Sequence, residues 1–186
     1  MKFQIAFVSA AALALVACGS NESADDTVAD ATATETADPY ATPAPDTTSP
    51  QAFVDTMAAS DMFEIEAAKL AQAQGKSDKV KAFAAMMIKD HTASSDKLKA
   101  AVAEAGGGLT IAPALTPVQQ GLLEQLKTGG ENFDAMYAQQ QVDAHEKALS
   151  ALQTQAASGT VAQLKAFAGE VAPTVETHLG HARDLS

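Results

Sequence analysis

Apolar residues recur at helical spacing in four long stretches of the chain, and none of these stretches shows the alternation of a half-buried strand. The stretches lie near residues 51–74, 77–105, 131–158 and 160–185. The breaks between them hold typical helix-ending or helix-starting residues, namely Gly75 with Ser77 or Asp78, Gly106-Gly107-Gly108, Gly129-Gly130 and Gly159-Thr160. The pattern predicts an all-α domain of four helices over residues 51–186.

The second and third predicted helices are joined by a long connection of about 25 residues. A short helix is expected inside it, after Thr116-Pro117. Two tight hairpins joined by one long crossover are typical of the ferritin-like four-helix bundle, and a plain up-down bundle with a long loop is the alternative. Pro173 lies inside the fourth predicted helix and is expected to kink it.

Each predicted helix carries one polar residue on its apolar stripe. When the helices are drawn at about 100° per residue, His91, His145 and His178 fall at the centres of their stripes. Glu64 falls within the stripe of the first helix, whereas Glu66 lies on the polar side. At about 1.5 Å of rise per residue, all four stripe residues lie in the middle third of a bundle. They are therefore predicted to converge.

Three imidazoles and a carboxylate suit zinc, iron, manganese or copper, and this donor set does not choose among the four metals. One metal ion bound by Glu64, His91, His145 and His178 is the first hypothesis. The alternative is a buried Glu–His hydrogen-bond network that fixes the register of the helices without metal, since a buried charge needs a partner in either case.

Four residues near this set are expected to play lesser roles. Met87 shares the stripe of His91, but a methionine in a core is usually a space filler. His181 follows His178 by three residues and is expected to be a partly exposed surface histidine. Asp90 points about 100° away from its neighbour His91, so it is expected to hydrogen-bond to a ligand or to cap. Asp134 is expected to cap or pair near the end of the bundle.

The N-terminal segment has the layout of a secretory signal. Lys2 precedes an apolar stretch from about Ile5 to Ala17, which is too short to span a bilayer. The following run Leu15-Val16-Ala17-Cys18-Gly19 resembles the bacterial lipobox. That resemblance implies a signal peptide over residues 1–17, cleavage before Cys18 and lipid on the Cys18 sulfur, with Gly19 favouring the periplasmic face of the outer membrane. The alternative is an ordinary signal peptide that contains a cysteine.

Residues 18–50 are expected to be a disordered acidic tether. They are rich in Ala, Thr, Asp, Ser and Pro, and they contain seven acidic residues and no Lys or Arg. Residues 51–186 contain 16 Asp and Glu against 11 Lys and Arg, which leaves this part a charge of −5. A mildly acidic domain has no electrostatic footprint for nucleic acid, so the expected partner is the membrane, through the lipid on Cys18.

Several motifs in the helical part resemble the bacterial envelope family known as domain of unknown function 4142. They are Met62 to Glu66, Val80 to Ala84, Met87 to His91, Phe133-Asp134 with Tyr137, and the late Pro173 followed by His178. The resemblance implies a ferritin-like fold and a location in the envelope, but no established activity. Ferritin-like di-iron proteins carry Glu-x-x-His on two helices, whereas here Ile88 precedes His91 and Val175 precedes His178 by three residues. A conventional di-iron centre is therefore not expected.

Two functional hypotheses follow from these patterns. The first is a tethered module that binds one transition metal for storage, buffering or stress protection. The second is a metal-free envelope module that contacts other proteins or the cell wall. An enzyme ranks third, because the sequence contains no nucleophile motif, no Gly-rich phosphate loop and no Cys-x-x-Cys.

Overall fold

The computed structural model describes residues 49–185. The predicted signal peptide, Cys18 and nearly all of the predicted tether lie outside the described residues. The described part is all-α and contains no strand. Its elements are α1 (Pro50–Gln74), α2 (Asp78–Ala105), α3 (Pro117–Lys127), the 3-10 turn η1 (Gly130–Asn132), α4 (Phe133–Ser158) and α5 (Ala162–Arg183). The four long helices and the short helix after Thr116 are those that the sequence predicts.

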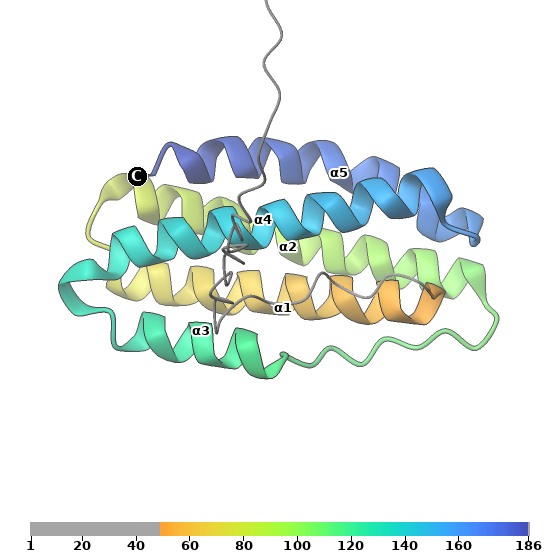
Figure 1. Cartoon of the computed structure of the whole chain (residues 1–186), viewed down its shortest axis with the longest axis horizontal. Coiled ribbons are helices and arrows are strands. Elements are labelled where there is room, and N and C mark those ends of the chain that lie inside the picture. Colours follow the sequence, from red (N-terminus) through yellow and green to blue (C-terminus); the bar gives the residue numbers. More distant parts are fainter. Residues whose placement is uncertain (1–48, 186) are drawn as a thin grey trace, which may run out of the picture. The chain divides into compact units, whose positions relative to one another are not determined.

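The helices form a ferritin-like bundle with one long crossover. Helices α1 and α2 pack as one hairpin and α4 and α5 as the other, while α2 lies against α5 and α1 against α4. After α2 the chain runs back along the bundle, through α3, and reaches the end at which α2 began (Figure 1). Consequently α2 and α4 run in the same direction, which an up-down bundle does not allow.

The long crossover begins at three consecutive glycines. Gly106, Gly107 and Gly108 have φ values of 63°, 68° and 78°, a left-handed conformation that only glycine adopts at low cost. They end α2 and turn the chain back. The side chain of Gln51 then holds the crossover against α1, since it accepts a hydrogen bond from the Thr110 amide at 3.1 Å and donates one to the Thr110 carbonyl at 2.9 Å.

The turn between α1 and α2 is fixed by two capping interactions. The hydroxyl of Ser77 accepts a hydrogen bond from the Val80 amide at 3.1 Å, as expected for the first residue of a helix. The carboxylate of Asp134, at the start of α4, accepts from the amides of Lys76 at 2.9 Å and Ser77 at 2.8 Å. The predicted capping roles of Ser77 and Asp134 are confirmed.

The core consists of two hydrophobic clusters. The first hydrophobic cluster includes Phe53, Leu98, Leu152 and Phe167. The second hydrophobic cluster lies at the other end of the same four helices and includes Phe63, Met87, Phe133 and Tyr137. His91, His145 and His178 each fall between residues of the two clusters on their own helix, and Asp61 does so on α1, so they form a polar layer that Glu64, next to Phe63, also joins. The buried charged or imidazole members of this polar layer are Asp61, Glu64, His91, His145 and His178.

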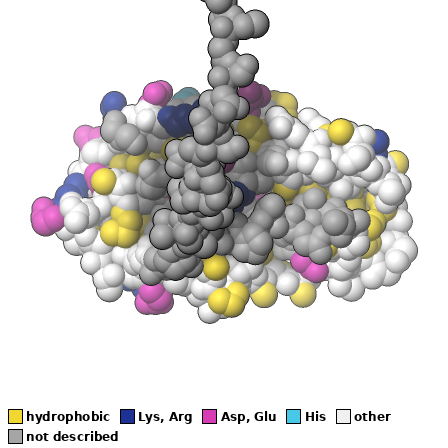
Figure 2. All heavy atoms as spheres, in the orientation of Figure 1, with side chains coloured by type: hydrophobic (Ala, Val, Ile, Leu, Met, Phe, Trp, Pro, Cys, Tyr) yellow, Lys and Arg dark blue, Asp and Glu magenta, His cyan; other side chains and the backbone are white. Residues whose placement is uncertain are grey.

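The outer surface of the bundle is mixed in character. Apolar side chains on the face seen in Figure 2 form small groups separated by polar atoms. Within residues 49–185, Met62 is the one large apolar side chain that is exposed, at 37 %. None of the helices in this range is both long and apolar enough to cross a bilayer.

Candidate metal centre

Three histidines from three different helices meet in the polar layer. His91 lies on α2, His145 on α4 and His178 on α5, and all three are buried. Their ring centroids are 5.5 to 5.6 Å apart. One ring nitrogen of each lies within 4.8 Å of those of the other two. The helical stripes place each histidine towards the interior, and the packing of the helices brings them together.

Each ring has one nitrogen that faces an oxygen acceptor. The contacts are His91 Nδ1 with Asp61 Oδ1 at 2.8 Å, His145 Nδ1 with the Gln141 carbonyl at 2.7 Å, and His178 Nε2 with Asp90 Oδ2 at 3.1 Å. Because carboxylates and carbonyls only accept hydrogen bonds, these ring nitrogens carry the hydrogen. Contacts of this kind fix the orientation and tautomer of metal-binding histidines.

The second nitrogen of each ring is buried, and none of the described residues forms a hydrogen bond with it. We call His91 Nε2, His145 Nε2 and His178 Nδ1 the open nitrogens. In a neutral ring whose other nitrogen carries the hydrogen, the open nitrogen presents a lone pair. Three buried lone pairs in one small region are the donor set that a borderline metal ion takes from a protein.

Asp61 is a member of the polar layer that was not predicted from the sequence. It is 5 % exposed, and its second carboxylate oxygen accepts a hydrogen bond from the Ser95 hydroxyl at 3.1 Å. The signal was present, because Asp61 follows Met57 by four residues and precedes Glu64 by three, so it lies on the same helical stripe. Asp61 therefore belongs to the site as the partner that orients His91.

Glu64 lies beside the three histidines but outside the group of mutually close ring nitrogens. Its Oε1 is 3.9 Å from His145 Nδ1, and both of its oxygens lack a well-formed hydrogen bond within the described part of the chain. Burial raises the pKa of Glu64 to about 7, against the opposing influence of the His91 charge and the Gln141 side chain. Glu64 as a fourth metal ligand stays a prediction.

The three histidines differ in their preference for protons. Burial lowers the pKa of His91, but the hydrogen bond with Asp61 and the charge of Glu64 outweigh it, so the pKa is raised. Burial lowers the pKa of His145 to about 3, and the pKa of His178 is also lowered, chiefly by burial. His145 and His178 are thus held in the neutral form that binds metal. At His91, whose pKa is raised, a proton competes with a metal ion for the ring.

Two neutral polar side chains extend the polar layer along α4. Tyr137 and Gln141 precede His145 by eight and four residues and are fully buried. Their side-chain polar atoms lack a well-formed hydrogen bond within residues 49–185. Burial, and then the charge of Glu64, raise the pKa of Tyr137. Tyr137 was predicted only as part of a family motif and Gln141 was not predicted, although both follow the helical spacing of His145.

The residues expected to play lesser roles do so. Asp90 forms its hydrogen bond with His178 rather than with its neighbour His91. Met87 is packed in the second hydrophobic cluster, as expected of a space filler. His181 is exposed. The set that can hold a metal ion therefore consists of three imidazoles, with Glu64 nearby and Asp61 and Asp90 behind the rings.

The comparisons with known proteins identify the family. Residues 33–185 match the family described as a domain of unknown function (DUF4142), so the chain belongs to that family. No curated protein and no solved structure was found to be similar to the chain. The resemblance seen in the sequence motifs is confirmed, and the family description assigns no activity.

Proposed function

We propose that this member of the family binds one transition metal ion through His91, His145 and His178, and that it serves metal storage, buffering or stress protection in the cell envelope. Glu64 is the proposed fourth ligand or the carboxylate that balances the charge of the ion. The observation that carries the proposal is the set of open nitrogens, one from each of three helices, buried within one layer.

The energetic cost of the unpaired open nitrogens supports a metal ion bound within the polar layer. A buried polar atom without a partner costs about 1–3 kcal/mol, and the open nitrogens are three such atoms in one place. A metal ion satisfies all of them at once. Zinc, iron, manganese and copper all accept imidazole and carboxylate donors, whereas the only cysteine, Cys18, lies far from the site in the sequence.

The proposal is tested by elemental analysis of the protein purified without a histidine tag. We expect about one metal ion per chain, and a raised melting temperature when the metal-free protein receives the metal, because a ligand that binds only the folded state stabilises it. His145→Gln should lose the metal. His181→Gln is the matched control, since it removes an exposed histidine, and it should keep the metal.

A metal content near zero for the wild-type protein, with an unchanged melting temperature after addition of zinc, iron, manganese and copper in turn, would contradict the proposal. Equal metal contents in the wild type and in His145→Gln would also contradict it, since they would place any bound metal elsewhere.

A metal-free structural role is the second candidate, and one contact favours it. The carboxylate of Asp61 lies 2.8 Å from His91, whose pKa is raised, so a protonated His91 has a buried counter-charge without any metal. In this case His145→Gln should change the melting temperature while the metal content of both proteins stays at zero. A metal that is present in the wild type and lost in the variant would exclude this role.

We also propose that the bundle is anchored by lipid on Cys18 at the periplasmic face of the outer membrane. The support is the run Leu15 to Gly19 and the presence of a single cysteine in the chain. Two or three acyl chains anchor a protein stably where one is marginal. Mass spectrometry of the mature N-terminus and fractionation of the membranes test this. A mature protein that begins elsewhere, or that carries an unmodified Cys18, would contradict it.

A further inference from the structure

A polar pocket of about 220 Å³ opens between α2 and α5, directly beside the candidate metal centre. Its walls include the rings of His91 and His178, together with Asp90. Ser94 and Lys97 of α2 and Thr174 of α5 lie around it. Thus two of the three proposed metal-binding residues reach a pocket at the surface.

The pocket ends at the rings and does not reach the open nitrogens. The open nitrogens of His91 and His178 are buried. The side chain of Asp90 is 27 % exposed, whereas that of His178 is 3 % exposed. An ion in the pocket therefore meets the Asp90 carboxylate first. The open nitrogens face away from the pocket, so the rings must move before the ion can reach them.

We propose that this pocket is the access route by which a hydrated divalent cation enters and leaves the histidine cluster. Asp90 is the carboxylate that meets the cation, and the His178 ring is the side chain that turns to let it pass. The two roles are linked, because turning the ring breaks its 3.1 Å contact with Asp90 and frees the carboxylate for the cation. The inference rests on the proposed metal-binding function.

The charges around the pocket suit a cation that keeps part of its water shell. Asp90 supplies a negative charge beside the ring, and the exposed ammonium of Lys89, 4.0 Å from Asp90 Oδ1, opposes it in part. The ammonium of Lys97 is 2.8 Å from the Glu170 carboxylate, so its charge is largely balanced. Hydroxyl groups of Ser94 and Thr174 can exchange hydrogen bonds with the water of the cation. The route therefore requires little dehydration before the ion reaches the rings.

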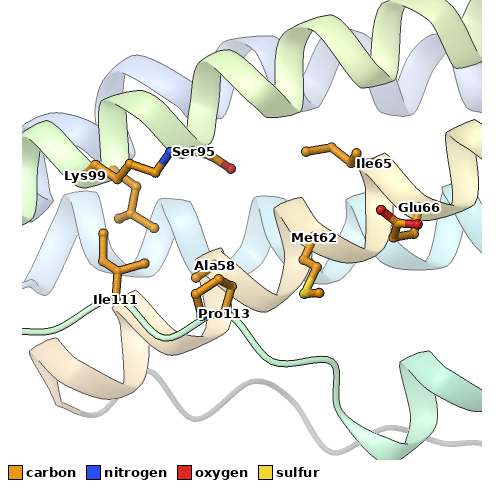
Figure 3. A pocket seen from close by; sticks show the side chains of 9 residues that line it. Ala58, Met62, Ile65, Glu66, Ser95, Lys99, Ile111 and Pro113 are labelled. Carbon is orange, nitrogen blue, oxygen red and sulfur yellow. The ribbon is translucent and has the colours of Figure 1, made fainter.

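The two other pockets described on this surface suit the role less well. One, of about 240 Å³, lies between α1, α2 and the crossover, where Pro113 and Ile111 face Ala58 and Met62 (Figure 3). Its lining is mainly apolar and contains no histidine; only Ser95 links it to Asp61. The other, of about 390 Å³, lies further along α2 and α5 and contains no histidine either.

An access route has a kinetic signature that a ligand does not have. A group that only obstructs the path raises the barrier for entering and leaving equally, so both rates fall and Kd is unchanged. A group that holds the bound ion changes Kd, mostly through the dissociation rate. Measuring both rates therefore distinguishes the pocket from the binding site.

The test fills the rim of the pocket with the double variant Ser94→Leu/Thr174→Leu. Uptake is followed by stopped-flow absorbance with Co²⁺, and loss is followed after mixing with excess EDTA. We expect both rates to fall by about tenfold, which corresponds to a barrier raised by roughly 1.4 kcal/mol. The Kd for Co²⁺ and the metal content should equal those of the wild type.

The matched control adds a comparable volume to the neighbouring pocket on the same helices. Ala100 and Ala166 are exposed and line the pocket of about 390 Å³. The double variant Ala100→Leu/Ala166→Leu should leave both rates unchanged. Thr174→Leu alone, on an exposed position, repeats the test if the double variant at the rim folds poorly.

The possible results separate the two proposals. Normal rates in the rim variants, with metal bound, would overturn the access route and leave the proposed function standing. An altered Kd with a normal uptake rate would also overturn it, because the rim residues would then act on the bound ion. Absence of metal from the wild type would overturn the proposed function and the access route together.

Discussion

The two hydrophobic clusters and the polar layer between them are built from the same four helices, yet they differ in how completely their groups are satisfied. Apart from Tyr137, the clusters bury aromatic and aliphatic side chains that need no hydrogen-bond partner, such as Phe53 against Phe167 with ring centroids 6.2 Å apart. The polar layer buries Glu64 and three imidazoles, and it leaves the open nitrogens without a partner within residues 49–185. The hydrophobic clusters therefore stabilise the bundle, whereas the polar layer has the unpaired donor atoms that a ligand could bind.

Helix α4 shows the difference within a single element. Leu152 belongs to the first hydrophobic cluster and Phe133 to the second, and His145 lies between them. If the polar layer served only to hold the helices, a leucine at His145 would do so without the cost of burying an imidazole. Buried polar groups that destabilise the fold, placed between two hydrophobic clusters that stabilise it, are typical of a functional site.

The largest expected effect comes from removing an imidazole from the polar layer. His145→Ala deletes one of the three open nitrogens, so we expect the metal affinity to fall by more than roughly 100-fold, beyond what loss of a supporting residue costs. Titration of the metal-free protein with a competing chelator measures this. His181→Ala, at an exposed histidine, is the control. Equal losses of affinity in both variants would contradict the prediction that the metal is bound by the polar layer rather than by surface histidines.

The matching change in a hydrophobic cluster should affect stability and spare the metal. Leu152 is 1 % exposed, and Leu152→Ala removes buried methyl groups and leaves a cavity, which costs about 2–5 kcal/mol. Chemical denaturation of the metal-free protein measures the loss. The metal affinity of the folded variant should equal that of the wild type. A large change in affinity would show that cluster and layer are coupled rather than separate.

Glu64→Gln tests the cost of a buried charge in the metal-free protein. The raised pKa means that the folded protein holds a proton on Glu64 that the unfolded chain releases. The free energy of unfolding of the protein therefore falls as the pH rises from 4.5 through about 7. The variant should match the wild type below pH 4.5 and exceed it above pH 7 by on the order of 3 kcal/mol.

Denaturation at pH 4, 6 and 8 measures this difference. With metal bound, the sign should reverse if Glu64 is a ligand, because the variant then loses a bond to the ion. An equal gain in stability with and without metal would mean that Glu64 does not bind it.

The smallest expected effect comes from the residues behind the rings. Asp61→Asn keeps an oxygen that can face His91 Nδ1 but removes the charge, so we expect the metal affinity to fall by about 10–100-fold. The same titration measures it. Asp55→Asn, at an exposed position on the same helix, should leave the affinity unchanged. If Asp61→Asn behaves like that control, Asp61 does not support the site.

Much of the fold follows from local pattern. The spacing of apolar residues predicted all four long helices, and Ser77 and the glycines from Gly106 mark helix ends for reasons that act within a few residues. The length of the connection between α2 and α4 favoured the crossover, which the parallel direction of these helices confirms. The stripes also predicted that His91, His145 and His178 are buried.

The sequence by itself determined which side chains point inward, because the helical repeat fixes the angle of each residue around its own axis. It did not determine distances across the bundle, because these depend on how the helices slide and rotate against one another. Only the tertiary structure therefore showed that the rings of three histidines meet and that Glu64 lies beside them rather than among the close donors. It alone paired Asp90 with His178, 88 residues away, since no local pattern encodes a contact between separate helices.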